Sequence, residues 1–400
     1  MKLIRVVILL LFIPAALGAS DFDFALNFHN SLKGQQDVDP VYSLNIDFWP
    51  RYTLLIGDNN DLVISAGLSF RYDDDMHFIP ELLQTHFTHR FGSSAIRIGR
   101  MIYSDPLSYV AEGLFDGFQF FTSSEMGRFN IGAWYTGLLY KKNANITMTK
   151  EEIIMFDAPI DFDDFSNTYF APARLVGAIG WEHPSLGEYL HLSAALVGQF
   201  DLRDTNVLYN SQYFIAKAAI PKAELLIELG GSAAISQTTG DKEETDVSFA
   251  GEAGFSYILP TSFLSRFSVK GKYASGKMED SYEAFNPITT TYAGNILEYR
   301  FSALSILSLN YTARLAPSFG AALTASYFIR NDLGTIVNYP VTPGSDGHLL
   351  GAEAYLQMVF SPVSDLQFNF GAGAFMPSFG DAGADEPVRW KADLKVIIAF

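Results

Sequence analysis

The sequence predicts an all-β fold, a transmembrane antiparallel up-and-down β-barrel of about eighteen strands with no plug domain. Three observations lead to this prediction: a composition rich in flat side chains, a repeated alternation of apolar and polar residues, and connections that alternate in length. Aromatic residues make up 14% of the chain and charged residues only 18%. Aromatic side chains fit a pleated surface, so this composition favours many strands over helices.

The alternation begins at Asp21 and recurs in segments of about ten residues, as in strands that cross a membrane. In one segment Leu62, Ile64 and Leu68 face one way, while Ser65 and Ser69 face the other. A soluble β-sheet with one buried face shows the same alternation. The periodicity alone therefore leaves a soluble all-β protein open as an alternative.

The connections between the segments favour the membrane barrel, because short turns and longer polar loops follow each other in turn along the chain. The short turns are 57–60, 92–94, 124–127, 184–187, 221–222, 260–261, 316–318 and 361–364. The long loops are 33–39, 73–79, 103–114, 143–167, 201–208, 238–246, 277–295, 331–347 and 379–386. Outer-membrane barrels combine short periplasmic turns with long external loops, so we expect both termini on the short-turn side.

The N-terminus has the pattern of an export signal. Lys2 and Arg5 precede an apolar core over 6–17, and Ala16-Leu17-Gly18 fits a small-x-small cleavage site. We expect a signal peptide over 1–18 and a single barrel domain over 19–400, in the outer membrane of a Gram-negative-type bacterium. A membrane anchor is the alternative, but the apolar stretch is short for one. The absence of Cys excludes lipoprotein acylation, disulfides and thiolate metal sites.

The last segment, 389–400, alternates apolar and polar residues and ends in Phe400. Such an ending looks like the signal by which barrel proteins are delivered to their assembly machinery. We therefore expect three kinds of partner: the barrel-assembly machinery, outer-membrane lipid on the apolar face, and a small-molecule solute. The formal net charge of −17 argues against nucleic acid, whose phosphates would be repelled.

Charged residues are sorted by position, with acids concentrated in the predicted outer loops and bases at inward strand positions. The residues expected to line the lumen are Arg97, Arg174, Arg266, Lys270, Lys272, Arg300, Glu252, Glu298, Glu353, Arg389, Lys391 and Asp393. Rings of charged side chains set the selectivity of wide pores, so a basic lumen favours anionic solutes. Alternatively, these bases pair with the acids in a ladder that only stiffens the wall.

A barrel of this size is too wide for its wall side chains to fill, so an aqueous path is expected unless loops close it. The loops 103–114, 143–167 and 277–295 are long enough to fold inward and constrict the pore. Apolar residues that a loop in water does not need support this expectation for two of them: Leu107, Tyr109, Val110, Ile153, Ile154, Met155 and Phe156. We expect neither a cofactor nor a metal site.

The stretch Arg97-Ile98-Gly99-Arg100, followed by Phe115-Asp116-Gly117, resembles the R-x-G-R…F-D-G segment of alginate-export-like barrels and some porins. The resemblance implies a passive channel for anionic polyuronate, with Arg97 and Arg100 in a lumen arginine cluster. Both arginines can point inward only at a bulge or strand end, because they have opposite parity on a regular strand.

These features predict a porin-like channel for passive diffusion of small hydrophilic, anionic solutes or polyuronate. An enzyme is not expected, because no G-x-S-x-G elbow occurs, and His86 and His89 lie on opposite strand faces. Two alternatives stay open. One is a fatty-acid-type transporter, a family that usually carries an N-terminal hatch; the other is an adhesin or purely structural barrel. Planar-bilayer conductance separates an open channel from both.

Overall fold

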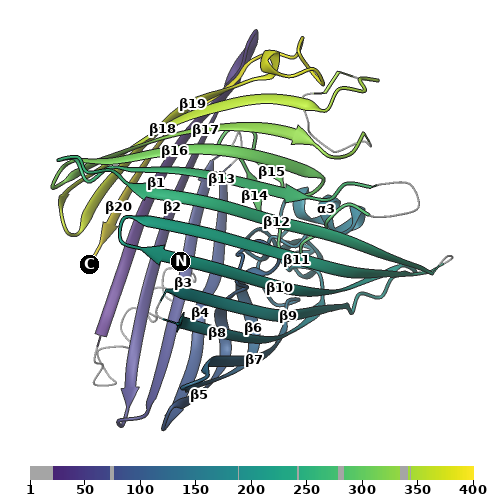
Figure 1. Ribbon diagram of the computed structural model, residues 1–400. Helices are drawn as coiled ribbons and strands as arrows, with labels where there is room; N and C mark the ends of the chain where they lie inside the picture. Colours follow the sequence, from purple (N-terminus) through teal and green to yellow (C-terminus); the bar gives the residue numbers. More distant parts are fainter. Residues whose placement is uncertain are drawn as a thin grey trace.

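The computed structural model describes residues 21–72, 76–187, 189–240, 243–277, 283–333, 341–342 and 344–400, and they form one β-barrel (Figure 1). The predicted signal peptide lies outside these ranges. The barrel strands are β1 (Asp21–Gln35), β2 (Val38–Ile56), β3 (Asn60–Tyr72), β4 (Met76–Phe91), β5 (Ser94–Ser104), β6 (Glu112–Ser124), β7 (Gly127–Tyr135), β8 (Arg174–Leu186), β9 (Leu190–Asp201), β10 (Leu208–Lys222), β11 (Leu225–Thr239), β12 (Glu244–Ile258), β13 (Arg266–Ala274), β16 (Leu304–Ala316), β17 (Phe319–Arg330), β18 (Leu349–Val363), β19 (Leu366–Met376) and β20 (Arg389–Ala399).

These strands form a closed 18-stranded sheet in which neighbours along the chain pair antiparallel. Closure is made by β1, which pairs with β2 on one side and with β20 on the other. The backbone N–H of Phe24 donates to the carbonyl of Phe400, and that of Phe400 donates back to Phe24, both at 2.9 Å. The predicted strand number, antiparallel closure and placement of both strand ends on the short-turn side are confirmed.

The two faces of the wall differ as the alternation predicts. In β3, Val63, Ser65 and Ser69 are buried on the inner face, whereas Ile64 is 38% exposed on the outer face. Ile179 of β8 and Leu196 of β9, which are cross-strand partners, are each 56% exposed. An apolar exterior around a closed barrel is stable in lipid. The chain is an outer-membrane β-barrel.

One predicted loop is wrong. Residues 33–39 were expected to form a long outer loop, but β1 and β2 continue through most of this range and meet at a tight turn over Gln36 and Asp37. Asp37 has φ +64°, a left-handed conformation that Asp tolerates in turns. The polar side chains there belong to strands that extend beyond the apolar band, so polarity did not mark a loop.

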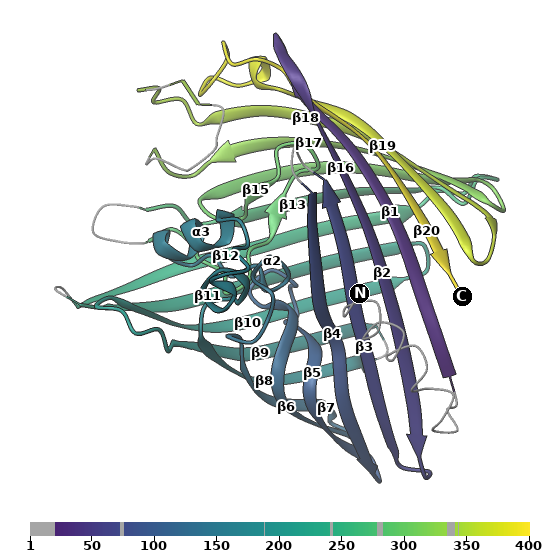
Figure 2. The same ribbon diagram turned by 180° about the vertical axis from the view of Figure 1, so that it is seen from behind.

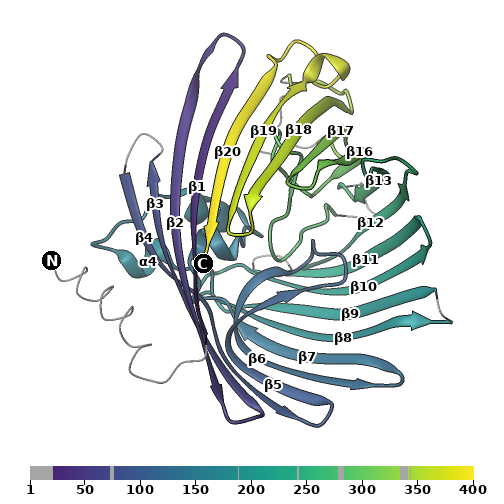
Figure 3. The same ribbon diagram turned by 90° about the vertical axis from the view of Figure 1, so that its left-hand side faces the viewer.

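The remaining elements lie in the longer connections. The β7–β8 connection carries α2 (Lys141–Ala144), α3 (Lys150–Asp157) and α4 (Phe165–Tyr169), and the β13–β16 connection carries β14 (Tyr292–Ala293) and β15 (Tyr299–Arg300). A short 3-10 helix, η1 (Pro377–Phe379), precedes β20. Figure 2 shows α2, α3 and β15 within the ring of strands, and Figure 3 shows α4 beside β4. In the described ranges, every helix is too short or too polar to cross a membrane.

Candidate pore constriction

Three connections meet inside the barrel: 105–111 between β5 and β6, 136–173 between β7 and β8, and 275–303 between β13 and β16. The backbone N–H of Ile288 donates to Val110 O at 2.8 Å, and that of Thr290 donates to Asn145 O at 2.7 Å. Leu107 packs so closely on Gly230 of β11 that a Cβ on this glycine would overlap it. The predicted inward folding is confirmed for 105–111 and for the segments around Asn145 and Ile288, whereas Ile154 and Phe162 farther along the β7–β8 connection are exposed.

An aromatic cluster joins the connections 105–111 and 275–303 to each other. Tyr109, Phe285 and Phe301 are each at most 1% exposed, and the rings of Tyr109 and Phe301 pack edge to face with centroids 5.1 Å apart. Leu107 and Val110 are buried as well, whereas Ile154 is 70% exposed. The apolar residues of 105–111 therefore build the constriction, and Ile154 faces away from it.

The loop 105–111 keeps its shape through one carboxylate. Asp105 Oδ1 accepts the backbone N–H groups of Leu107 and Ser108, and Oδ2 accepts those of Val110 and Ala111. Burial raises the pKa of Asp105, although the four hydrogen bonds favour its ionised form. The loop is thus rigid because its own backbone donors converge on one side chain.

Helix α3 is fixed to the wall by an ion pair that is shielded from solvent. Glu152 Oε1 lies 2.6 Å from Arg174 Nη2 of β8, and both side chains are 0% exposed. The same glutamate forms a capping box with Thr149 at the start of α3. Glu152 lies in the predicted outer loop 143–167, among the acids concentrated in such loops, yet it is fully buried; the T-x-x-E spacing of a capping box indicates its role. Arg174 points inward but is fully covered, so it anchors α3 and contacts no solvent path.

A segment that we call the strap, residues 294–298, crosses the lumen to the strands on the far side. Glu353 of β18 accepts the backbone N–H groups of Asn295 at 2.7 Å and Ile296 at 3.0 Å. Glu298 lies 2.6 Å from Lys33 Nζ of β1 and 2.7 Å from Lys391 Nζ of β20. Partial burial disfavours the charged form of Glu298, but the two lysines outweigh it and lower the pKa.

Beside the strap lies a polar cavity of about 280 Å³ inside the barrel. Its charged lining residues are Lys270 and Lys272 of β13, and hydroxyl groups of Ser308, Thr324 and Ser326 line the wall near them. Lys272 has no ion-pair partner in the part of the chain that the structure describes. Its Nζ lies 5.5 Å and 5.6 Å from the ring centroids of Tyr109 and Phe301, so a positive charge faces the aromatic cluster of the loops.

Other lysines of this wall are paired. Lys217 Nζ lies 3.1 Å from Glu228 and 3.5 Å from Glu252, and Lys270 Nζ lies 2.8 Å from Glu252. These residues form the ladder that the sequence left open as an alternative. The ladder ends at Lys270, which is both paired and part of the cavity wall.

The other predicted lumen residues are dispersed. Arg300 is in β15 rather than a barrel strand, and its guanidinium bonds to Asn286. Arg266 is at the short-turn end of β13, and Arg389 borders a second cavity of about 500 Å³ near Lys33. Asp393 accepts a hydrogen bond from Tyr355. Within the described ranges, no three His, Asp or Glu side chains are grouped to hold a metal ion.

The expected cluster of Arg97 and Arg100 does not form. The Arg97 guanidinium lies 5.3 Å from the ring centroid of Phe121. Arg100 has the parity of the exposed Ile98 and pairs with Asp116 at 2.6 Å. The two arginines therefore take opposite sides of β5, as regular strand geometry requires.

Comparison with known proteins shows the fold. No family profile matches the sequence, and no curated protein sequence matches it. Among solved structures, OccK2 (OpdF) of Pseudomonas aeruginosa in complex with glucuronate has a TM-score of 0.62 at 10% identity, covering 95% of each chain. OpdK with vanillate, from the same organism, has a TM-score of 0.61 at 11% identity over 95% of this chain and 98% of that one.

OprD of P. aeruginosa has a TM-score of 0.58 at 13% identity over 96% of this chain and 94% of that chain. These neighbours are outer-membrane porins, and the match extends over the barrel rather than one part of it. The alginate-export-like resemblance finds no support among them. At such low identity the comparison establishes one conclusion: this chain has the 18-stranded barrel fold of the OprD and Occ outer-membrane porins.

Proposed function

We propose that this protein is an outer-membrane channel for passive diffusion of small hydrophilic anions, with Lys270 and Lys272 at the constriction. The observation that carries the proposal is the unpaired Lys272 ammonium beside a polar cavity of about 280 Å³. An ammonium without a carboxylate partner in a water-filled channel attracts anions. The hydroxyl groups of the cavity add donors that a carboxylate accepts.

Two structural neighbours support the choice of solute. OccK2 was solved with glucuronate and OpdK with vanillate, and both ligands are small carboxylates. The three loops that cross the lumen favour a solute of this size over a polyuronate chain. Arg266 and Arg389 lie toward the two mouths of the barrel in this proposal, where they attract anions before they reach the constriction.

Reversal potentials in a salt gradient across a planar bilayer test the proposal. The wild-type channel is expected to prefer anions, and Lys272→Gln to lose most of that preference while retaining its conductance. Lys222→Gln removes the same charge from the short-turn end of β10, at an exposed position, and serves as the matched control. Cation preference in the wild type, or an equal effect of the two substitutions, contradicts the proposal.

A further inference from the structure

The barrel wall is split between β4 and β5. Their ladder runs from the pair Phe91–Ser94 to the pair Thr85–Arg100 and ends there, yet β4 continues to Met76 and β5 to Ser104. We call the facing unpaired edges, 76–84 and 101–104, the seam. If the register continued, Leu83 would stand opposite Ile102. The seam occupies the outer half of the wall, because the intact ladder is at the short-turn end.

Two glycines lie where the β4–β5 ladder ends. Gly99 of β5 and Gly117 of β6 are cross-strand partners, and Gly99 has φ +121°. A Cβ on Gly99 would overlap the carbonyl of Thr85, and one on Gly117 would overlap that of Ala133. Only glycine allows this approach. Beyond the pair the β5–β6 hairpin turns into the barrel (Figure 3), where Phe115 packs against Trp134.

The edge of β4 at the seam is satisfied by side chains instead of by β5. Arg100 Nη1 donates to Leu82 O at 2.7 Å, and the Tyr169 hydroxyl donates to Pro80 O at 2.6 Å. Pro80 has no N–H to leave unpaired. Lipid cannot satisfy backbone polar groups, so these bonds replace the missing ladder.

The β7–β8 connection also covers this edge, because Ile79 packs with Tyr140 and Tyr169 and Asn143 donates to Glu81. The uncovered part of the seam is therefore its base, where Ile102 is exposed.

The ion pair at the base of the seam is formed by residues of the R-x-G-R…D-G segment. Arg100 pairs with Asp116 in a bidentate manner, at 2.7 Å and 2.6 Å, and also donates to Leu138 O at 2.8 Å. A charge with lipid-facing parity is costly unless it is fully bonded. The motif therefore builds the end of the seam: Gly99 with Gly117 bends the hairpin, and Arg100 with Asp116 closes the base.

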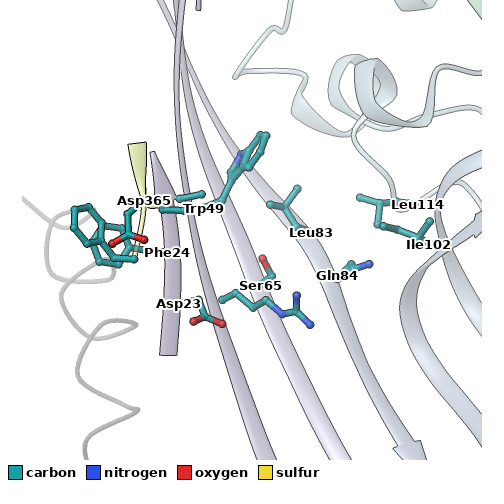
Figure 4. A pocket seen from close by; sticks show the side chains of 13 residues that line it. Asp23, Phe24, Trp49, Ser65, Leu83, Gln84, Ile102, Leu114 and Asp365 are labelled. Atoms are coloured by element: carbon teal, nitrogen blue, oxygen red, sulfur yellow. The ribbon is translucent and has the colours of Figure 1, made fainter. Parts of the chain in front are cut away.

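Behind the seam lies a cavity of about 670 Å³ that is separate from the lysine cavity of the lumen. Figure 4 shows Leu83 of β4 at its centre, Ile102 and Leu114 on one side, and Trp49 on the other. Ile102 is 53% exposed and stands where β5 leaves the wall. The apolar side of the cavity thus adjoins the opening toward lipid.

The opposite side of the cavity is polar. Arg51, Ser65 and Gln84 line it, together with two acids: Asp23, the cross-strand neighbour of Arg51, and Asp365 of the turn between β18 and β19. Among the described residues no carboxylate lies within salt-bridge distance of Arg51, and this includes its cross-strand neighbour Asp23. One free guanidinium with an amide and a hydroxyl beside it, facing an apolar half, is complementary to a carboxylate on a hydrocarbon chain.

We propose that this cavity is a second binding site, for a single-chain carboxylate amphiphile that enters from the outer leaflet through the seam. The carboxylate lies at Arg51 and Gln84, and the hydrocarbon chain lies along Leu83, Ile102 and Leu114. This proposal does not depend on the anion pathway of the lumen, because neither Lys270 nor Lys272 borders the cavity.

Binding is tested with the barrel in lipid nanodiscs and a dibrominated sixteen-carbon carboxylate, whose bromines quench tryptophan at short range. The signal of Trp49 is the difference between the wild type and Trp49→Phe, which retains the other three tryptophans. The expected result is that quenching of Trp49 saturates as the probe concentration rises. Probe dissolved in the lipid adds a component that rises linearly with concentration. Linear quenching alone overturns the proposal.

Recognition of the head group is tested by Arg51→Gln, with Arg128→Gln as the matched control at an exposed position of β7 that does not border the cavity. Loss of a charge-assisted bond predicts about tenfold weaker binding for Arg51→Gln and unchanged binding for the control. The brominated alcohol of equal length is expected to bind the wild type about as weakly as the acid binds Arg51→Gln. Equal affinity of the acid and the alcohol contradicts the assignment of Arg51.

Entry through the seam is tested by closing it. The chain has no cysteine, so Leu83→Cys with Ile102→Cys introduces a unique pair for a short bifunctional thiol reagent. The cross-linked barrel is expected to lose the saturable quenching while its ion conductance persists. Each single-cysteine variant treated alike is expected to keep saturable quenching at a weaker affinity, because Leu83 and Ile102 also line the cavity. Unchanged quenching in the cross-linked barrel rejects the seam as the route.

Discussion

Arg174 of β8 and Glu152 of α3 form an ion pair at 2.6 Å in which neither side chain is exposed. Removing one partner of such a pair leaves an uncompensated charge, which costs about 3–5 kcal/mol. Glu152→Gln is therefore expected to lower stability by about 3 kcal/mol, near the lower end of that range because Asp201 still lies 3.4 Å from Arg174. Urea unfolding followed by tryptophan fluorescence measures the loss. Glu151→Gln, at an exposed neighbour, is the control and is expected to change little.

Tyr109 fills the centre of the constriction between Phe285 and Phe301. Tyr109→Ala removes a large buried ring, and truncations of this kind cost about 3–5 kcal/mol. The loops are expected to loosen, so single-channel conductance rises and becomes noisier. The exposed Tyr189, in a short turn, provides the control substitution. An unchanged conductance in Tyr109→Ala would show that the pathway avoids the aromatic cluster.

Acid is expected to release the strap. Because Lys33 and Lys391 lower the pKa of Glu298 in the folded protein, its contribution is complete above the ordinary pKa of 4.5 and is lost as pH falls through the lower folded-state value. Current fluctuations should therefore increase only below about pH 4.5. Glu298→Gln, which cannot titrate, should fluctuate at every pH. Equal behaviour of the two proteins at pH 7 would exclude this role.

Phe400 is expected to matter for delivery to the assembly machinery more than for the finished barrel. Its ring stacks on Phe24 at 5.0 Å, at the short-turn rim. Phe400→Ser should reduce the amount of folded barrel in cells, measured by heat-dependent gel mobility, whereas refolding into detergent in vitro should stay near normal. Phe24→Ala removes the same stacking contact but keeps the terminal residue. If both variants fail equally in cells, packing explains the effect.

Much of the fold was predictable because the alternation of apolar and polar residues along a barrel strand shows which side chains face outward and which face inward. Alternation fixed the faces of β3, where Ile64 faces outward and Ser65 inward, and short turns marked one end of the barrel. The hairpin at Gln36 and Asp37 was missed because a strand that extends beyond the membrane is polar on both faces. Local patterns cannot separate such a strand from a loop.

The site was less predictable because it depends on contacts across the lumen. Parity correctly set Arg97 and Arg100 on opposite faces of β5. It could not show that Arg174 is covered by α3, or that Lys272 meets Tyr109 from another loop. These relationships join residues far apart in the sequence. A capping-box pattern at Thr149 and Glu152 was the one local signal that marked an anchor.

The contacts of Glu298 also indicate that the strap docks only after the barrel has closed. Its two lysine partners come from β1 and β20, the first and last strands to be synthesised, and these strands are neighbours only once the cylinder is complete. The carboxylate cannot find both ammonium groups in a nascent, open sheet. The docking of the strap on both lysines therefore requires that β1 and β20 have already paired.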